Sequence, residues 1–342
     1  MQFSRLINKL VDGYSLEAQE MQAFMNALMQ GDIDAVQAGA VLIALRAKGE
    51  SIEELTVAAQ TMLDFALPVE IAGEHLVDTC GTGGDGADTF NISTGSALVA
   101  AAAGAIVAKH GNRSVSSHCG SADCLELAGV TIDLPVPAVQ ACIAKVGIGF
   151  LFAPNFHPAM RHVIGIRKSL GVRTLFNLLG PLTNPARPPY KVIGVFDKAW
   201  LAAMAQAASA LGVARVMTLH SEEGLDEISP AATTHVVEII NGETRSYTVT
   251  PEDFGYSPIE LSAIKATSPE HSLQTLQMAL KGDTPASQAI AMNAAAALYI
   301  AQLASDLKEG AAMAMDAMRD QRATDKLQAL IEVSRTEAQK YV

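Results

Sequence analysis

The chain has 342 residues, about half of them apolar, and a formal net charge of −12. This length favours two domains, and the acidic balance excludes a general binder of nucleic acid or of anionic membranes. Any anionic ligand must therefore be held by a local cluster of basic groups and backbone amides.

The cysteines and the apolar segments indicate in which cellular compartment the protein is expected. The four cysteines, Cys80, Cys119, Cys124 and Cys142, form neither a Cys-x-x-Cys pair nor a zinc-binding spacing. Such thiols are typical of a reducing compartment. The first residues lack the apolar segment of a signal peptide, and no alanine-rich run is uninterrupted over the length of a membrane span. We therefore expect a cytoplasmic protein with no membrane partner.

Residues 1–66 have the apolar spacing of four successive helices. The third is expected from about residue 33 to residue 48, ending at Gly49. The fourth is expected to begin with a capping box formed by Ser51 and Glu54. This part of the chain predicts a small all-helical domain.

From residue 76 onward, short apolar strands alternate with helices. The expected strands are 76–77, 105–108, 149–153, 191–196 and 215–219, and the expected helices are roughly 94–103, 121–129, 136–146 and 198–211. Alternation of this kind indicates a parallel sheet with right-handed crossovers, which binds ligands at the carboxyl ends of its strands. The predicted fold class is α/β, with a small all-helical domain and a larger α/β domain whose central, mostly parallel sheet is flanked by helices.

Two segments depart from this alternation. Residues 157–171 and 173–184 predict two helices with no strand between them. We infer that the chain returns there to the helical domain, which would place a cleft between the two domains. The predicted boundaries are 1–69 with 160–187 for the helical domain and 70–159 with 188–342 for the α/β domain. Further on, Asn241-Gly242 between two apolar runs predicts a β-hairpin with a type I′ turn.

Four glycines lie between residues 81 and 86, directly after the first strand. Glycine adopts positive φ and lets a ligand approach the backbone closely, and successive N–H groups in such a turn bind an anion. Ser93 or Thr94 is expected to cap the helix that follows. The glycine spacing also matches a dinucleotide fingerprint, but a cationic stretch at 109–113 replaces the acidic ribose-binding residue of that fingerprint. The ligand predicted here is a phosphorylated molecule and not a dinucleotide.

Two further polar groups follow strands. Residues 109–117 contain two cations, one amide and three hydroxyl groups, which is typical of an anion site. Residues 222–227 are acidic and end in Asp226 and Glu227. Magnesium prefers oxygen ligands and often joins one or two carboxylates to substrate phosphates, so these two residues are candidate metal ligands; the alternative is an acidic surface loop.

A candidate carboxylate clamp lies in the inserted helices. Arg167, with Arg173 beyond it, is by default a surface residue. In a cleft that faces a phosphate site, its planar guanidinium would suit a carboxylate. No Ser–His or Cys–His pair has the spacing of a nucleophile and its base.

Six short segments carry a resemblance to a known family. They are residues 81–85, 91–94, 109–117, 157–160, 173–185 and 226–227. Together they resemble the anthranilate phosphoribosyltransferase family, which has a fold of the nucleoside phosphorylase/phosphoribosyltransferase type. The resemblance implies transfer of the phosphoribosyl group of 5-phosphoribosyl 1-pyrophosphate to the amine of anthranilate, in tryptophan biosynthesis. It also implies a homodimer formed through the helical domains, which would carry the anthranilate side of the site, and an α/β domain that would bind the donor and Mg²⁺.

The resemblance further implies the contacts of each ligand. The donor, 5-phosphoribosyl 1-pyrophosphate, would be held by Gly81, Gly84, Asp85, Thr89, Asn91, Ile92, Ser93, Thr94, Lys109, His110, Gly111, Asn112, Arg113, Ser114, Val115, Ser116, Ser117 and Ser121. Anthranilate would contact Gly81, Asn112 and Arg167, and the catalytic residues would be Lys109, Asn112 and Arg167. Two Mg²⁺ ions would bind through Ser93, Asp226 and Glu227. The pair His118-Cys119 stands where the family is expected to have Lys/Arg-Ser, and this difference would alter the contacts to the pyrophosphate.

Two alternative functions share parts of this sequence pattern. A pyrimidine nucleoside phosphorylase is similar in fold and also has a Lys-His strand end, whereas residues 112–117 suit a pyrophosphate better than a single phosphate. A non-catalytic relative that binds nucleic acid would lack the metal carboxylates and have a basic surface. Asp226 and Glu227 are present and the chain is acidic, so the expected partners are small molecules and not nucleic acid.

Overall fold

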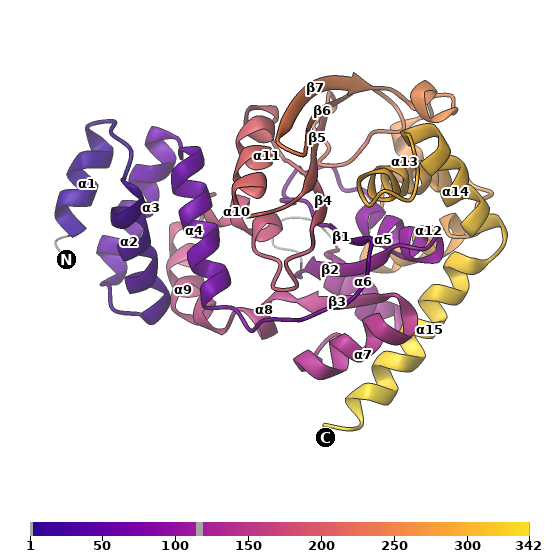
Figure 1. The fold of residues 1–342 in the computed structure, drawn as a ribbon, viewed down its shortest axis with the longest axis horizontal. Helices are drawn as coiled ribbons and strands as arrows, with labels where there is room; N and C mark the ends of the chain where they lie inside the picture. The colour runs from indigo at the N-terminus through magenta and orange to yellow at the C-terminus, as the bar shows by residue number, and fades with distance from the viewer. Residues whose placement is uncertain (1–2, 114–118, 342) are drawn as a thin grey trace.

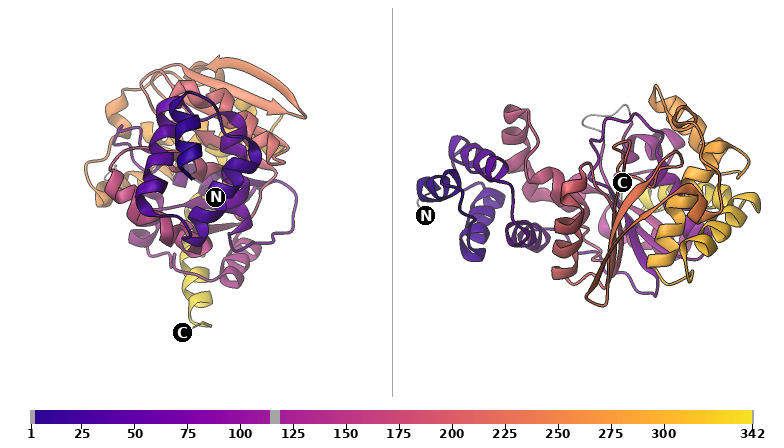
Figure 2. Two further views of the ribbon diagram at one scale, coloured as in Figure 1. Left: turned by 90° about the vertical axis from the view of Figure 1, so that its left-hand side faces the viewer. Right: turned by 90° about the horizontal axis from the view of Figure 1, so that it is seen from above.

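The structure is a computed structural model, and it describes residues 3–113 and 119–341. The predicted donor contacts of Ser114, Val115, Ser116 and Ser117, and the departure at His118, lie outside the described residues. Figures 1 and 2 show an elongated molecule with the N-terminal helices at one end and a twisted sheet with its covering helices at the other.

Four helices form the N-terminal bundle, as the apolar spacing predicts. They are α1 (Phe3–Val11), α2 (Ala18–Gln30), α3 (Ala35–Lys48) and α4 (Ile52–Asp64). The capping box of α4 is confirmed, because the Ser51 hydroxyl accepts from the Glu54 N–H at 3.1 Å and the Glu54 carboxylate accepts from the Ser51 N–H at 2.7 Å. Helix α3 stops at Gly49 as expected, and it begins two residues later than expected because the Asp34 carboxylate caps it.

The sheet has seven strands in the order β3-β2-β1-β4-β5-β6-β7. They are β1 (Leu76–Thr79), β2 (Ile106–Gly111), β3 (Ile148–Phe152), β4 (Tyr190–Gly194), β5 (Arg215–Ser221), β6 (Thr234–Ile240) and β7 (Glu243–Val249). Strands β1 to β5 run parallel to one another. Strand β6 pairs antiparallel with β5, and β7 pairs antiparallel with β6. The strand order reverses direction at β1, so the crevice beyond the ends of β1 and β4 is where such a sheet binds ligands.

Helices cover both faces of the sheet (Figure 1). They are α5 (Ile92–Ala102), α6 (Ser121–Ala128), α7 (Val136–Val146), α11 (Leu201–Ala210), α12 (Pro269–Ala279), α13 (Pro285–Ile300), α14 (Leu307–Arg319) and α15 (Arg322–Ala338). Alternate strand residues point to opposite faces: Val192 packs in the core formed with α5 and α13, whereas Ile193 packs in the core formed with α11. The predicted fold class, with its helical domain and mostly parallel sheet, is confirmed.

The segment that interrupts the strand alternation contains α8 (Ala153–Phe156), α9 (Arg161–Leu170) and α10 (Phe176–Leu179). Its buried Val163 and Leu175 belong to the same apolar core as Phe24 and Leu42 of the N-terminal bundle. Figure 2 shows this segment between the bundle and the sheet. It therefore contributes to both sides of the space between them.

Two local expectations are wrong. Helix α5 begins at Ile92 with Asn91 at its N-cap position and no side-chain cap, so Ser93 and Thr94 lie inside its first turn and do not cap it. Strand β2 does not end at residue 108, because its pairing with β3 continues to Gly111 opposite Phe152. Lys109 is therefore held by the sheet and not by a loop.

The predicted hairpin is confirmed: Asn241 and Gly242 join β6 to β7, and both have the positive φ of a type I′ turn, 52° and 83°. In the described part of the chain, none of the helices is long and apolar enough to cross a membrane.

The buried carboxylate of Glu54 gives a test of the bundle. It accepts from the Leu16 N–H at 2.8 Å and pairs with Lys48 Nζ at 2.8 Å, and the Glu54 side chain has no exposed surface. Replacing it by alanine leaves the N–H groups of Leu16 and Ser51 without their acceptor and the Lys48 ammonium without its carboxylate, although Ser15 and the Gly49 carbonyl still accept from that ammonium. We expect Glu54→Ala to lower the free energy of unfolding by about 3 kcal/mol.

Urea unfolding followed by circular dichroism measures this loss. The matched control is Glu53→Ala, because Glu53 is the exposed neighbour on the same helix. Equal stability of the two variants would contradict the assigned role of Glu54.

Candidate active site

The glycine loop that follows β1 lies at the switch point of the sheet. Gly83, Gly84 and Gly86 have φ of 64°, 76° and 72°, a region that disfavours other residues. The Thr82 N–H donates to the carbonyl of Gly194 at the end of β4, at 2.8 Å. The loop is thus anchored to the neighbouring strand and exposes its backbone to a cleft of about 390 Å³.

The acidic loop after β5 lies across this crevice. A Cβ atom on Gly194 would lie 1.6 Å from the Asp226 carbonyl oxygen, and one on Gly81 would lie 2.6 Å from Asp226 Oδ2. Only glycine at these two positions permits this approach. Asn293 of α13 then fixes the loop, since its side chain bonds both the N–H and the carbonyl of Ile228, at 2.8 and 3.0 Å.

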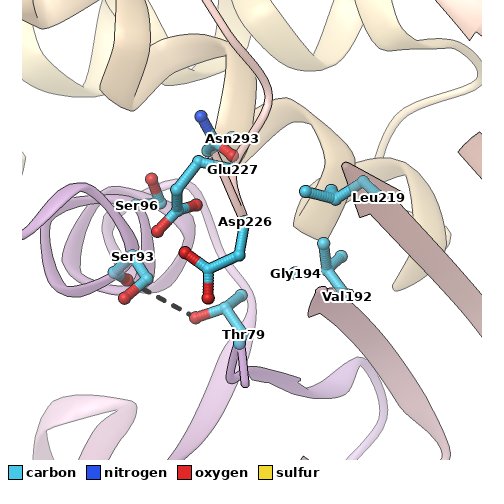
Figure 3. Close-up of a pocket in the computed structure, with 10 residues that line it drawn as sticks. Thr79, Ser93, Ser96, Val192, Gly194, Leu219, Asp226, Glu227 and Asn293 are labelled. Carbon is cyan, nitrogen blue, oxygen red and sulfur yellow. Dashed lines mark hydrogen bonds between the residues drawn. The ribbon is translucent and has the colours of Figure 1, made fainter. Parts of the chain in front are cut away.

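Asp226 and Glu227 point their carboxyl groups toward Ser93 and Thr79 (Figure 3). Burial and then the neighbouring Asp85 raise the pKa of Asp226 to about 7, and burial together with Asp226 raises the pKa of Glu227 well above its usual range. The two carboxyl groups are thus buried beside other acidic groups, and Lys109 offsets part of this effect at Glu227.

This arrangement fits a small divalent cation. A cavity of about 10 Å³, close to the volume that holds one water molecule, is lined by the hydroxyl of Ser93 and by Asp226 and Glu227. Magnesium prefers such an all-oxygen donor set, and it completes its shell with water or phosphate oxygens. Its charge would also favour the ionised form of both carboxyl groups.

Lys109 occupies the floor of the cleft. Its Nζ donates to the Thr79 carbonyl at 3.0 Å and to the Ser93 hydroxyl at 3.3 Å. Asp78 and Lys191 are buried beneath it; burial raises the pKa of Asp78, with Lys191 opposing this, and burial lowers the pKa of Lys191. The negative charge of Asp78 on β1 and the positive charges of Lys109 on β2 and Lys191 on β4 therefore stabilise one another.

Arg113 is engaged by carboxylates in this structure. Its Nη1 lies 3.0 Å from a carboxylate oxygen of Asp123 and 2.8 Å from one of Glu126. Hydrogen bonds to these carboxylates, with Glu126 contributing most, raise the pKa of Arg113. Asn112 lies beside it and accepts from the Arg113 N–H at 2.8 Å, and the Ser121 hydroxyl donates to the Asn112 carbonyl at 3.4 Å. A donor phosphate would have to compete with these carboxylates for the guanidinium.

The opposite wall of the cleft is largely apolar. Met62 of α4 and Met160, Ile164 and Phe176 of the inserted segment line it together with Arg167. The Arg167 guanidinium lies 5.6 Å from the centroid of the Phe176 ring, and burial is the cause that lowers its pKa. A half-buried cation beside aromatic and aliphatic surface suits an aromatic carboxylate.

Two histidines lie between these walls. The rings of His110 and His157 are 5.2 Å apart between centroids, and both line the cleft. Burial lowers the pKa of His110 to about 4 and that of His157 to about 3. Both rings are therefore neutral at pH 7, and the Nε2 atom of each lacks a hydrogen-bond partner among the described residues.

The structure gathers nearly all of the described candidate residues in this one cleft. Its lining includes Gly81, Gly84, Asp85, Thr89, Asn91, Ile92, Ser93, Lys109, His110, Gly111, Asn112, Arg113, Ser121, Arg167, Asp226 and Glu227. Thr94 is the exception, because its side chain is buried inside α5. Sequence reasoning gave no role to Met62, Gly194 or Asn293, whose parts in the site depend on contacts between distant segments.

A helical bundle joined to an α/β domain with an anion-binding strand edge is the architecture of a class of glycosyl transferases. Residues 4–66 match the helical bundle domain of the glycosyl transferase family, and residues 73–324 match its a/b domain.

Relatives over the whole chain narrow this class. The chain is 47% identical to anthranilate phosphoribosyltransferase of Chromohalobacter salexigens, with 99% of each chain covered, and 49% identical to that of Thioalkalivibrio sulfidiphilus, with 97% of this chain and 98% of the relative covered. It belongs to the anthranilate phosphoribosyltransferase family, which confirms the resemblance drawn from the six segments.

Solved structures agree with this assignment. The enzyme from Thermus thermophilus superposes with a TM-score of 0.91 at 42% identity, covering 96% of this chain and 99% of that one. The Saccharomyces cerevisiae enzyme in complex with PRPP and Mg has a TM-score of 0.89 at 27% identity, with 98% of each chain covered.

The raised pKa of Asp226 predicts a pH effect on stability. Its folded pKa of about 7 lies above the ordinary value of about 3.9, so its contribution to stability is present below about pH 4 and is lost as the pH rises through about 7. Asp226→Asn cannot ionise. We expect the melting temperature of this variant, relative to the wild type, to rise by a few degrees between pH 5 and pH 8 in the absence of divalent metal.

Differential scanning calorimetry in a metal chelator measures this difference. Asp32→Asn, at an exposed position, controls for the loss of a carboxylate. A difference between Asp226→Asn and wild type that stays constant with pH would show that Asp226 ionises normally.

Proposed function

We propose that the protein transfers the phosphoribosyl group of 5-phosphoribosyl 1-pyrophosphate to the amine of anthranilate, giving N-(5-phosphoribosyl)anthranilate and pyrophosphate, a step of tryptophan biosynthesis. The observation that carries this proposal is a single cleft with an anion-binding wall and an apolar wall that ends in the Arg167 guanidinium, which has no ion pair with a described residue. The family membership supports it.

The anion-binding wall suits the donor. The glycine loop supplies backbone N–H groups, and Lys109 supplies a cation near the ends of β1 and β2. Departure of pyrophosphate from ribose C1′ develops negative charge on the leaving group, which such fixed groups stabilise. We propose Lys109 and Asn112 as catalytic residues that face the donor, with the other residues of this wall as its binding site.

The apolar wall suits the acceptor. Anthranilate would lie against this wall with its carboxylate facing Arg167 and its amine toward Asn112 and Gly81. An aromatic amine is neutral at pH 7 and can attack C1′ without a strong general base. The new N–C1′ bond forms as the C1′–O bond to pyrophosphate breaks, and the amine then releases a proton. Alignment of the two reactants supplies much of the acceleration.

Magnesium is the proposed cofactor, held by Ser93, Asp226 and Glu227. When bound, it neutralises charge on the pyrophosphate. Support comes from the oxygen-lined cavity between these residues and from the related yeast enzyme, which has been solved with PRPP and Mg. Two ions, as expected from the resemblance, would require that donor oxygens complete both coordination shells.

We also propose a homodimer formed through the helical domain, made of residues 1–69 and 160–187. The N-terminal bundle carries solvent-exposed apolar side chains in this monomer, among them Val11 and Val36 on helices and Tyr14 between α1 and α2, which are 72%, 79% and 67% exposed. Exposed apolar groups of this kind favour burial against a second copy. A monomeric mass in sedimentation equilibrium would exclude this assembly.

A cytoplasmic location is proposed as well. All four cysteines are unpaired thiols, as is usual in a reducing compartment. Detection of the protein in an oxidising compartment by fractionation would contradict it.

The function is tested by following the loss of anthranilate fluorescence with the purified protein. Turnover is expected only when donor, anthranilate and Mg²⁺ are all present, and pyrophosphate should form in equal amount. Phosphorolysis of thymidine or uridine in place of this reaction would favour the phosphorylase alternative. Salt-sensitive binding of single-stranded DNA without turnover would favour the nucleic-acid-binding alternative.

Arg167 gives a sharper test of the acceptor site. Removal of its guanidinium takes away a charge-assisted contact to the carboxylate, so Arg167→Ala should raise the KM for anthranilate about 30-fold and the KM for the donor less than about threefold. Lys168→Ala, at the exposed neighbouring position, should leave both constants near the wild-type values. An equal rise of the two constants in Arg167→Ala would refute the carboxylate role.

A further inference from the structure

Arg173 lies between α9 and α10, outside the lining of the cleft, and still contacts the glycine loop. Its Nη2 donates to the carbonyl of Gly84. The guanidinium carbon lies 4.2 Å from the centroid of the Phe196 ring, just beyond β4. The main-chain carbonyl of Arg173 accepts from Nη1 of Arg46, on α3, at 2.9 Å. The residue thus connects the helical bundle, the sheet and the glycine loop.

Other contacts hold the beginning of the glycine loop and also Asp85, whose carboxylate accepts from the Asp226 N–H at 3.5 Å. The Gly83 N–H donates to Asp226 Oδ2 at 2.7 Å, and Thr82 Oγ1 accepts from the Phe196 N–H at 2.9 Å. Among the described residues of the inserted segment, Arg173 alone bonds to the loop, and it does so at its middle. A run of glycines with positive φ has no regular structure of its own, so these external ties determine its shape.

The Gly84 carbonyl and the Asp85 N–H belong to one planar peptide group and point in opposite directions. When Arg173 holds the carbonyl on the outer side of the loop, the Asp85 N–H is directed to the other side. Asp85 lines the cleft, and no described residue accepts a hydrogen bond from its N–H. The orientation of this free backbone donor is therefore set from outside the cleft.

We propose that Arg173 is a positioning residue for the donor substrate, which fixes the middle peptide groups of the glycine loop so that their N–H groups face the phosphates. The proposal rests on the proposed function for the identity of that substrate. The Phe196 ring beneath the guanidinium and the Arg46 contact behind it hold Arg173 in place. The segment that carries Arg167 on the acceptor side thereby also fixes the donor loop.

Steady-state kinetics of Arg173→Gln test this role. We expect the KM for 5-phosphoribosyl 1-pyrophosphate to rise about tenfold and the KM for anthranilate to change by less than about twofold, because a charge-assisted hydrogen bond to the loop is lost. Arg173→Lys keeps a cationic donor without the planar stacking and should recover part of the loss. Phe196→Leu leaves the guanidinium but removes the ring, and should give a smaller change in the same direction. Arg161→Gln, at an exposed arginine of the same segment, should match the wild type.

Hydrogen exchange of the substrate-free proteins provides a readout that does not depend on turnover. Amides of residues 83–87 should exchange several-fold faster in Arg173→Gln than in Arg161→Gln, while those of α9 remain unchanged. Unchanged exchange in the loop, or an equal rise of both Michaelis constants without rescue by lysine, would overturn the proposal. If exchange is faster in Arg173→Gln but the wild type has no transferase activity, the role of Arg173 in holding the loop stands and the proposed donor substrate is wrong. Should Arg173→Gln not fold, the Arg173→Lys and Phe196→Leu variants decide by the same two measurements.

Discussion

The site depends on one close approach between two backbones. The carbonyl oxygen of Asp226 lies where the Cβ of any other residue at position 194 would be. Because β4 ends in a glycine, the acidic loop after β5 can cross the ends of β1 and β4, and Asn293 of α13 holds it there. The carboxyl groups consequently meet the first turn of α5 at Ser93, whose hydroxyl accepts from Lys109 Nζ of β2.

Charge is distributed according to the same geometry. The chain as a whole is strongly acidic, yet Lys109 and Arg167 both face the cleft. Lys109 is held by a carbonyl and a hydroxyl and not by a carboxylate, which leaves its charge available to a phosphate. Asp226 and Glu227 are the acidic counterpart, since burial and a neighbouring carboxyl group raise the pKa of each.

Local chemistry explains which features could be predicted from sequence. The capping box at Ser51, the turn at Asn241-Gly242 and the anion-binding character of the glycine loop each depend on residues near in sequence. The failures depend on distant contacts: β2 continues through Lys109 because β3 pairs with it, and Thr94 is turned into the core because α5 starts earlier than the cap pattern indicated. Arg113 selects Glu126 and Asp123 as partners, which no spacing rule would reveal. Gly194 and Asn293 carry no local signal at all.

The position of Met62 means that the N-terminal bundle helps to determine which acceptors the cleft prefers. This side chain comes from the last turn of the N-terminal bundle, yet it forms part of the apolar wall. The contour that surrounds the aromatic ring is thus assembled from two stretches of chain about a hundred positions apart. Exchanging the bundle between family members would therefore transplant part of the discrimination among ring-substituted acceptors, even with every phosphate-binding residue left in place.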